Sequence, residues 1–206
     1  MLPSKVQSRD SGSFLQQALP WIVIAGMFAS MVISMQLMGR VWWCEEGDWA
    51  FWISDVWTSH CSQHFADPYT ITHMSHGLIF WTAIFFWGRW MPAWSVPMRW
   101  RLPVAVGIAT AWEILENTPM VINRYRTVTM SLDYMGDSIA NAAGDVAACM
   151  LGFVIARRLG WKWAMGILLV TEIVLLFWIR DNLTLNVIML FWPIEAVKQW
   201  QAGGAG

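Results

Sequence analysis

Long apolar runs recur along this chain and constrain its fold more than any other feature. A transmembrane helix needs about 20 mostly apolar residues to cross roughly 30 Å of hydrocarbon. Six runs approach or reach this length, over residues 20–38, 69–87, 102–118, 132–156, 161–179 and 183–197. We therefore expect an all-α membrane protein, with one bundle of about six transmembrane helices over residues 20–198. Residues 1–19 would be a cytoplasmic segment and residues 199–206 a flexible tail.

The last run is the weakest of the six. It is the shortest, and it carries Pro193 and Glu195 near its end. A tilted span and a re-entrant segment both remain open for it, because non-helical backbone at membrane depth is tolerated where protein covers it.

Composition agrees with a membrane protein. Only 13% of the 206 residues are charged, whereas about a quarter are charged in soluble domains. We expect many of the seventeen tryptophans at the membrane–water interfaces, where the amphipathic indole ring is favoured. A net charge of −1 leaves no basic surface for a phosphate backbone, which argues against nucleic-acid binding.

Lysine and arginine positions predict the orientation, because these residues concentrate in cytoplasmic loops. With the N-terminus inside, nine of them are cytoplasmic: Lys5, Arg9, Arg89, Arg99, Arg101, Arg157, Arg158, Lys162 and Lys198. Four are then periplasmic: Arg40, Arg124, Arg126 and Arg180. We expect a multi-pass protein of the bacterial inner membrane with both termini cytoplasmic. Residues 39–68 and 119–131 would face the periplasm.

The three cysteines differ in their expected surroundings. Cys44 and Cys61 fall in the longer periplasmic segment, where disulfides persist. A Cys44–Cys61 disulfide and two unbridged thiols are equally compatible with the sequence. Cys149 lies within the fourth run and is expected to be a packing residue.

Ionisable residues share one depth, at the periplasmic ends of the runs. A charged group inside a span costs about 2.5–3.5 kcal/mol and therefore faces the bundle interior. His73 with His76, and Glu113 with Glu116, are each three residues apart and so share one helix face. The other polar residues at this depth are Asp133, Asp137, Asn141, Asp145, Arg180, Asp181, Asn182 and Asn186. We expect these side chains to meet in one periplasm-facing pocket.

Four of these residues are spaced by four along the fourth run: Asp133, Asp137, Asn141 and Asp145. On one helix they would form a polar stripe of about 18 Å. The alternative for the aspartates and for Glu113 and Glu116 is a structural network paired with Arg124 and Arg126. For His73 and His76 the alternative is helix capping or satisfied interior histidines, and His60 and His64 are expected to be solvated.

Several motifs carry a resemblance to a known family. They are Trp112-Glu113-Ile114-Leu115-Glu116-Asn117, Arg124-Tyr125-Arg126, Ser131-Leu132-Asp133-Tyr134, Gly136-Asp137-Ser138, His76-Gly77 and Arg180-Asp181-Asn182. The chain resembles a bacterial family of multi-pass membrane proteins known only as a domain of unknown function. That resemblance implies a membrane location and no particular activity.

A looser similarity covers residues 113–152. A Glu on one helix, an Arg in the next loop and an Asp–Asn–Gly series after it are similar to the VanZ-like teicoplanin-resistance family. The chain departs from that family in lacking its Gln near Glu116 or Asn117 and in adding Asp145. The similarity implies an envelope role close to glycopeptide or lipid-linked saccharide chemistry.

Our first hypothesis is a pocket that binds or acts on an envelope lipid or a lipid-linked phosphate or saccharide, assisted by a divalent metal. The expected catalytic residues are Glu113, Asp137 and His76. The expected ligand-binding residues are Arg124, Arg126, Asn117, Asn141 and Arg180, since arginine pairs with phosphate in a bidentate manner. The expected metal ligands are Asp133, Asp137, Glu116 and His73.

Two other classes of function are compatible with the sequence. In the first, the chain is a non-catalytic accessory or assembly subunit of a larger membrane complex, and the polar cluster only fixes helix packing. In the second, the pocket transports protons or a small solute, although the cytoplasmic halves of the runs carry few ionisable groups. A nucleotide-dependent phosphotransferase is excluded, because the longer motif of those enzymes is absent.

Overall fold

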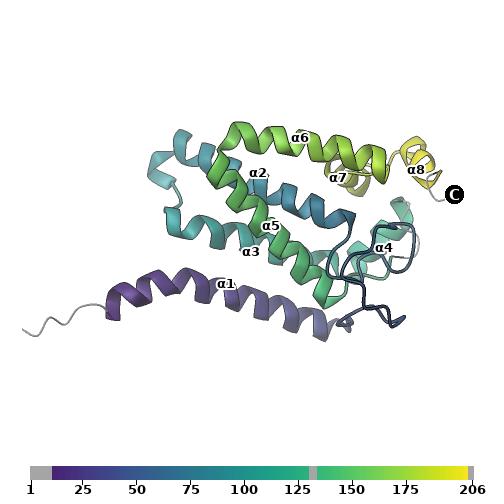
Figure 1. Cartoon of the computed structure of the whole chain (residues 1–206), viewed down its shortest axis with the longest axis horizontal. Coiled ribbons are helices and arrows are strands. Elements are labelled where there is room, and N and C mark those ends of the chain that lie inside the picture. The colour runs from purple at the N-terminus through teal and green to yellow at the C-terminus, as the bar shows by residue number, and fades with distance from the viewer. Residues whose placement is uncertain (1–10, 130–133, 204–206) are drawn as a thin grey trace, which may run out of the picture.

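The computed structural model describes residues 11–129 and 134–203, and the regular secondary structure of this part of the chain is helical. Its helices in chain order are α1 (Ser11–Leu37), α2 (Pro68–Trp90), the short 3-10 helix η1 (Pro92–Trp94), α3 (Met98–Glu116), α4 (Pro119–Val128), α5 (Ile139–Leu159), α6 (Trp161–Trp178), α7 (Leu183–Phe191) and α8 (Glu195–Ala202). Over the described residues there is no strand, only an isolated bridge between Trp52 and Ala66. The long helices run side by side (Figure 1).

Three helices in the described part are long and apolar enough to cross a membrane. They cover Phe14–Leu37, Ile139–Leu159 and Trp161–Trp178. α5 is the most enclosed of the three, with 56% of its apolar window buried, whereas the values for α1 and α6 are 22% and 11%. Large apolar surfaces are rare on soluble monomers, so the exposed faces of α1 and α6 indicate a membrane protein.

Glycines bring α2 and α5 into backbone contact. A methyl group added to Gly77 would lie 1.9 Å from the Cys149 carbonyl oxygen, and one added to Gly152 would lie 1.9 Å from that of Met74. Gly144 has an equivalent approach, at 2.0 Å, to the Phe65 carbonyl oxygen. Small residues allow this close approach between helices in membranes. The crossing sets the rotation of α2, and with it the direction in which the α2 histidines point.

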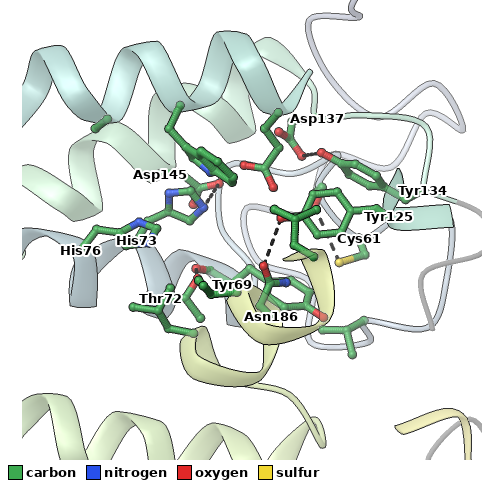
Figure 2. Close-up of a pocket in the computed structure, with 18 of the residues that line it drawn as sticks. Cys61, Tyr69, Thr72, His73, His76, Tyr125, Tyr134, Asp137, Asp145 and Asn186 are labelled. Carbon is green, nitrogen blue, oxygen red and sulfur yellow. Dashed lines mark hydrogen bonds and ion pairs between the residues drawn. The ribbon is translucent and has the colours of Figure 1, made fainter. Parts of the chain in front are cut away.

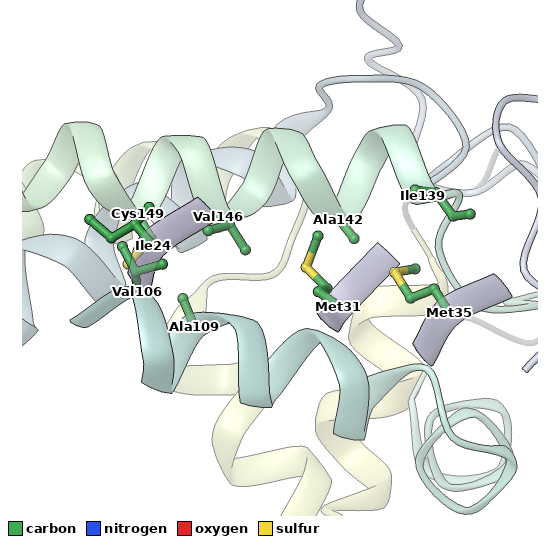
Figure 3. Close-up of a cluster of buried hydrophobic side chains, with 9 residues drawn as sticks. All are labelled: Ile24, Met31, Met35, Val106, Ala109, Ile139, Ala142, Val146 and Cys149. Atoms are coloured by element: carbon green, nitrogen blue, oxygen red, sulfur yellow. The ribbon is translucent and has the colours of Figure 1, made fainter. Parts of the chain in front are cut away.

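Apolar side chains of α1, α3 and α5 form a core on the other side of α5 (Figure 3). Met31 and Met35 of α1 are fully buried there, and Cys149 of α5 is 1% exposed. The expectation that Cys149 is a packing residue is confirmed. The complete cluster is Ile24, Met31, Met35, Val106, Ala109, Ile139, Ala142, Val146 and Cys149.

A group of exposed tryptophans lies at the end of the bundle where α2 ends and α6 begins. Trp90, Trp94 and Trp163 are each at least 70% exposed, and Trp161 of α6 packs against Phe86 of α2 with ring centroids 5.3 Å apart. This is the position expected for an aromatic belt at a membrane–water interface.

The fourth apolar run is helical over a shorter range than its hydropathy predicts. α5 begins at Ile139 rather than at residue 132, and Ser138 caps it by accepting a hydrogen bond from the Asn141 N–H at 3.0 Å. Gly136, with φ of +93°, and Asp137 precede the cap in a non-helical segment. The predicted four-residue stripe is therefore wrong for Asp137, and Asp133 lies outside the described residues. Asn141 and Asp145 do share the helix.

The last run is not one helix. α7 ends at Phe191 and α8 starts at Glu195, with Pro193 in the break, because proline interrupts helical hydrogen bonding. Nine residues of α7 span only about 14 Å. A single transmembrane helix over 183–197 is therefore wrong, and the re-entrant alternative remains.

The C-terminal helix lies at the end of the bundle that also holds α4 and residues 39–67, while α1 begins at the opposite end (Figure 1). Lys198 of α8 donates a hydrogen bond from Nζ to the Thr127 carbonyl of α4 at 2.7 Å. The described ends of the chain thus differ from the expectation that both termini lie on one side. The physical reason is that α7 is too short to return the chain across the bundle.

Candidate functional site

A cavity of about 450 Å³ opens between α2, α3, α4, α7 and residues 56–62 (Figure 2). Its polar wall carries His73, His76, Glu116, Asp137 and Asp145. No lysine or arginine is among the described residues that line it. Its apolar wall is formed by Phe80, Ile108, Ala109, Trp112, Val187, Leu190 and Phe191. The cavity therefore combines an acidic end with a surface suited to hydrocarbon.

His73 lies between two buried carboxyl groups from different helices. Its Nδ1 is 3.2 Å from Glu113 Oε1 of α3, and its Nε2 is 3.9 Å from Asp145 Oδ2 of α5. Glu113 is 0% exposed, Asp145 3% and His73 8%. Figure 2 shows the contact between His73 and Asp145, with His76 one turn further along α2. The α2–α5 crossing thus brings an imidazole between two acids away from bulk water.

Glu113 is buried without hydrogen bonds. Among the described residues, neither of its carboxylate oxygens has a hydrogen-bond partner, and the contact of Oε1 with His73 is an ion pair. Asp145 Oδ1 is in the same position. Such a group costs about 1–3 kcal/mol unless something satisfies it.

His73, Glu113 and Glu116 are arranged to hold a metal ion. Each offers one ligand atom, and these atoms lie within 4.8 Å of one another. Imidazole and carboxylate together suit divalent ions such as Mn²⁺, Fe²⁺ and Zn²⁺. The oxygens of Glu113 accept no hydrogen bond among the described residues, and Asp145 lies on the far side of the imidazole.

Asp137 lines the same cavity but has its hydrogen bonds satisfied. Its Oδ2 accepts from Asn117 Nδ2 at 2.7 Å and its Oδ1 from the Tyr134 hydroxyl at 2.9 Å. Its backbone N–H donates to Asn117 Oδ1 at 2.7 Å. Burial raises the pKa of Asp137, and the bonds from Asn117 and Tyr134 oppose that rise. The arrangement favours a positioning role, and the catalytic and metal-binding assignments of Asp137 stay predictions.

Asn117 and Asn141 both serve the scaffold. The amide of Asn117 joins α3 to Asp137, and Asn141 Nδ2 donates to the His64 carbonyl at 2.8 Å. Neither is among the residues that line the cavity. Their assignment as ligand-binding residues remains untested.

The predicted phosphate-binding arginines do not line the cavity. Arg124 Nε donates to the Leu190 carbonyl at 2.9 Å, and Arg180 Nη1 donates to the Trp200 carbonyl at 2.9 Å. Arg126 is exposed on α4. The ion pair that the structure gives Glu113 is with His73, not with the arginine partners considered from the sequence.

Sequence reasoning missed two groups. Asp67 caps α2, because its side chain accepts from the backbone N–H groups of Tyr69 and Thr70. The signal was present in Asp67-Pro68-Tyr69-Thr70, since Asp before Pro with Thr three residues later indicates a helix start. His64 is fully buried, so the expectation of a solvated residue is wrong for it.

Of the two alternatives for Cys44 and Cys61, the structure has the unbridged one, with both as free cysteines.

Asp181 predicts how stability depends on pH. Burial raises its pKa to about 6, against hydrogen bonds from the Asn182 N–H and the Tyr69 hydroxyl. The fold prefers the neutral carboxyl, so its contribution is complete below the unfolded pKa of about 3.9 and is lost as pH rises through about 6. We expect the melting temperature and the free energy of unfolding to fall as pH rises between these values. Asp181→Asn should reduce the fall in the free energy of unfolding by up to about 3 kcal/mol. Parallel melting curves against pH for the two proteins would contradict this assignment.

Comparison with known proteins gives consistent matches. A family model described as a protein of unknown function (DUF2585) matches residues 35–203. A UPF0314 protein of Rhizobium meliloti is 48% identical, and the alignment covers 91% of this chain and 93% of the relative. A UPF0314 protein of Paracoccus denitrificans is 40% identical, over 92% of this chain and 95% of the relative. No solved structure gives a significant match.

Proposed function

This chain belongs to the DUF2585 family of proteins of unknown function, and we propose that its cavity binds a divalent cation through His73, Glu113 and Glu116. Through that cation it holds the phosphate of an envelope lipid or a lipid-linked phosphate. The observation that carries the proposal is the pair of Glu113 oxygens, buried without a hydrogen-bond partner beside two further ligand groups.

A purely structural network is a poorer account of these residues. Structural networks of buried polar groups satisfy their members, as the bonds around Asp137 do. Glu113, Glu116 and Asp145 instead crowd around one histidine. Like charges held this close disfavour one another. A divalent cation would offset that repulsion and satisfy the oxygens of Glu113.

The class of ligand follows from the rest of the cavity. Described lining residues include no lysine or arginine, so an anionic headgroup would take its positive partner from the metal. Mn²⁺ and Mg²⁺ bind carboxylates and phosphates together. Ile108, Trp112, Leu190 and Phe191 would cover the acyl or prenyl chain of the same ligand. The VanZ-like resemblance of residues 113–152, which the sequence alone suggested, would likewise imply a role in the cell envelope.

We propose a membrane topology with five crossings, by α1, α2, α3, α5 and α6. Their lengths of 18 to 27 residues correspond to about 27–40 Å. The N-terminus is cytoplasmic, the cavity opens to the periplasm, and α7 and α8 stay on the periplasmic side. Moving Lys198 outside changes the lysine and arginine count from nine against four to eight against five, which keeps the positive-inside bias.

Reporter fusions test this topology at three positions. Fusions after Thr127 and Gly206 should give periplasmic activity, and a fusion after Gly160 should give cytoplasmic activity. The C-terminal fusion is decisive, because six crossings would place it in the cytoplasm. A cytoplasmic signal after Gly206 would contradict the five-crossing arrangement.

Binding of Mn²⁺ to the purified full-length protein tests the cation site. Mn²⁺ prefers oxygen ligands over thiolates, so its binding reports on the cluster of His73, Glu113 and Glu116. We expect one Mn²⁺ per chain, with affinity reduced roughly tenfold or more in His73→Gln and Glu116→Gln, since losing even an outer-shell partner costs about 10–100-fold. Glu195→Gln, an exposed acid on α8, is the matched control.

The cation site would be contradicted by stoichiometric Mn²⁺ binding that none of the ligand variants changes, or by no Mn²⁺ binding at all. In the second case, co-purification with a larger membrane complex would favour the accessory-subunit function. The broad exposed faces of α1 and α6 are the observation that keeps this second candidate.

A further inference from the structure

Three residues of the segment 39–67 bring metal-ligand atoms together outside the cavity. Cys44, His60 and His64 each offer one such atom, and the three atoms lie within 4.8 Å of one another. The Cys44 Sγ is 3.5 Å from His60 Nδ1. Cys44 and His64 are buried and His60 is half-buried. This cluster contains a thiol, which the cavity cluster lacks.

The two imidazoles are oriented as metal ligands are. His64 Nδ1 lies 2.7 Å from the Ala50 carbonyl and donates to it, so its Nε2 carries the lone pair. That Nε2 is buried and has no hydrogen-bond partner among the described residues. His60 Nε2 lies 2.9 Å from Glu46 Oε2, which leaves its Nδ1 facing Cys44. Metal-binding histidines characteristically donate their other N–H to a carbonyl or a carboxylate.

Asp48 lies next to both histidines of this cluster. Its Oδ1 accepts from the Ala50 N–H at 2.9 Å. Its Oδ2 lies 3.8 Å from His64 Nε2 and 4.0 Å from His60 Nδ1. The Trp43 indole N–H donates to the Asp48 backbone carbonyl at 2.8 Å and holds this turn.

We propose that Cys44, His60, His64 and Asp48 form a Zn²⁺ site. One thiolate, two imidazoles and one carboxylate supply the four ligands of a tetrahedral zinc centre, and the thiolate selects against Mg²⁺ and Mn²⁺. Binding would release the Cys44 thiol proton to solvent. The buried Nε2 of His64, which has no hydrogen-bond partner among the described residues, is the independent observation that points to a bound ion.

The site would fix the wall of the cavity. Segment 39–67 contains no helix, and its carbonyl groups cap α5. Ser62, Val41 and Trp42 accept from the first N–H groups near the α5 start at 2.9, 2.8 and 3.2 Å. The same segment contributes residues 56–59, 61 and 62 to the cavity lining, next to His60. A metal ion bound by Cys44, His60 and His64 would hold this wall in place.

Cobalt titration of the metal-stripped, full-length protein in detergent tests the site. Co²⁺ bound to a thiolate gives an intense near-ultraviolet charge-transfer band. We expect the band to saturate at one Co²⁺ per chain and to be lost in Cys44→Ser. Cys61→Ser, in the same segment, and Cys149→Ser should keep it, as should His73→Gln in the cavity. Mn²⁺ binding should persist in Cys44→Ser, so the two metal proposals can fail separately.

A second measurement needs no variant. In the wild-type protein, Zn²⁺ should slow alkylation of Cys44 by a maleimide at least tenfold, and a chelator should restore the rate. Peptide mass spectrometry identifies the modified cysteine. The proposal is overturned if the wild type gives no thiolate band, if Cys61→Ser rather than Cys44→Ser removes it, or if Cys44 and Cys61 are disulfide-bonded in protein purified without reductant.

Discussion

Replacing Glu113 with methionine should raise the melting temperature of the metal-free protein and abolish the stabilisation that Mn²⁺ gives. Glu113 is fully buried and its oxygens have no hydrogen-bond partner among the described residues. Its ion pair with His73 is one of two, so His73 keeps Asp145 as a partner in the variant. A buried polar group of this kind costs about 1–3 kcal/mol, and an apolar side chain of similar shape removes that cost. The wild type should gain about 2.7 kcal/mol at a Mn²⁺ concentration of 100 times Kd. The variant should gain nothing.

Asp137→Asn is the matched control for this measurement. Both of its carboxylate oxygens accept hydrogen bonds, and the Asn117 amide group would then face a second amide. We expect Asp137→Asn to lower the melting temperature with and without Mn²⁺, by about 1–3 kcal/mol in stability. If Glu113→Met destabilises the metal-free protein as much as Asp137→Asn does, Glu113 belongs to the structural network.

Gly152→Ala should cause a large loss of stability, because it adds a methyl group where α2 and α5 are in backbone contact. The new carbon would lie 1.9 Å from the Met74 carbonyl oxygen, which belongs to the backbone of α2. No side-chain rotation relieves that clash, so α2 and α5 must separate. Overpacking costs about 1–3 kcal/mol where side chains can adjust, and we expect about 3 kcal/mol or more here. His73 would also move away from Asp145.

Gly166→Ala provides the control on α6. A methyl group there meets nothing within 4 Å, and alanine favours the helix by up to about 1 kcal/mol over glycine. Folded yield after detergent extraction and the thermal unfolding midpoint measure both variants. Equal yields and midpoints for Gly152→Ala and the wild type would show that α2 and α5 do not cross this closely.

Hydropathy predicted most of the helices. Inside a membrane, the backbone N–H and C=O groups of an apolar run must form hydrogen bonds within the protein, and a helix provides them. The run 161–179 became α6 at Trp161–Trp178, and the run 69–87 became α2 at Pro68–Trp90. Hydropathy failed at 134–138, where Gly136 and the Ser138 cap delay α5. It failed again at Pro193, where one apolar stretch divides into α7 and α8.

The gathering of His73 and Glu116 around one cavity could be predicted, since helical spacing gives the depth of each residue. The side chains that these residues contact could not be predicted. Whether Glu113 meets an arginine or His73 depends on the rotation of α2, which the backbone contacts of Gly77 and Gly152 determine. The Cys44, His60 and His64 cluster was also beyond prediction, because turns rather than a periodic element bring these residues together.

Mass spectrometry of lipids that co-purify with the full-length protein tests the central claim most directly. The wild type should carry an enriched phosphorylated lipid. A chelator wash should release it, and Glu116→Gln should lack it while Glu195→Gln retains it. A lipid profile that is the same in all of these samples would contradict a metal-dependent phosphate site in the cavity.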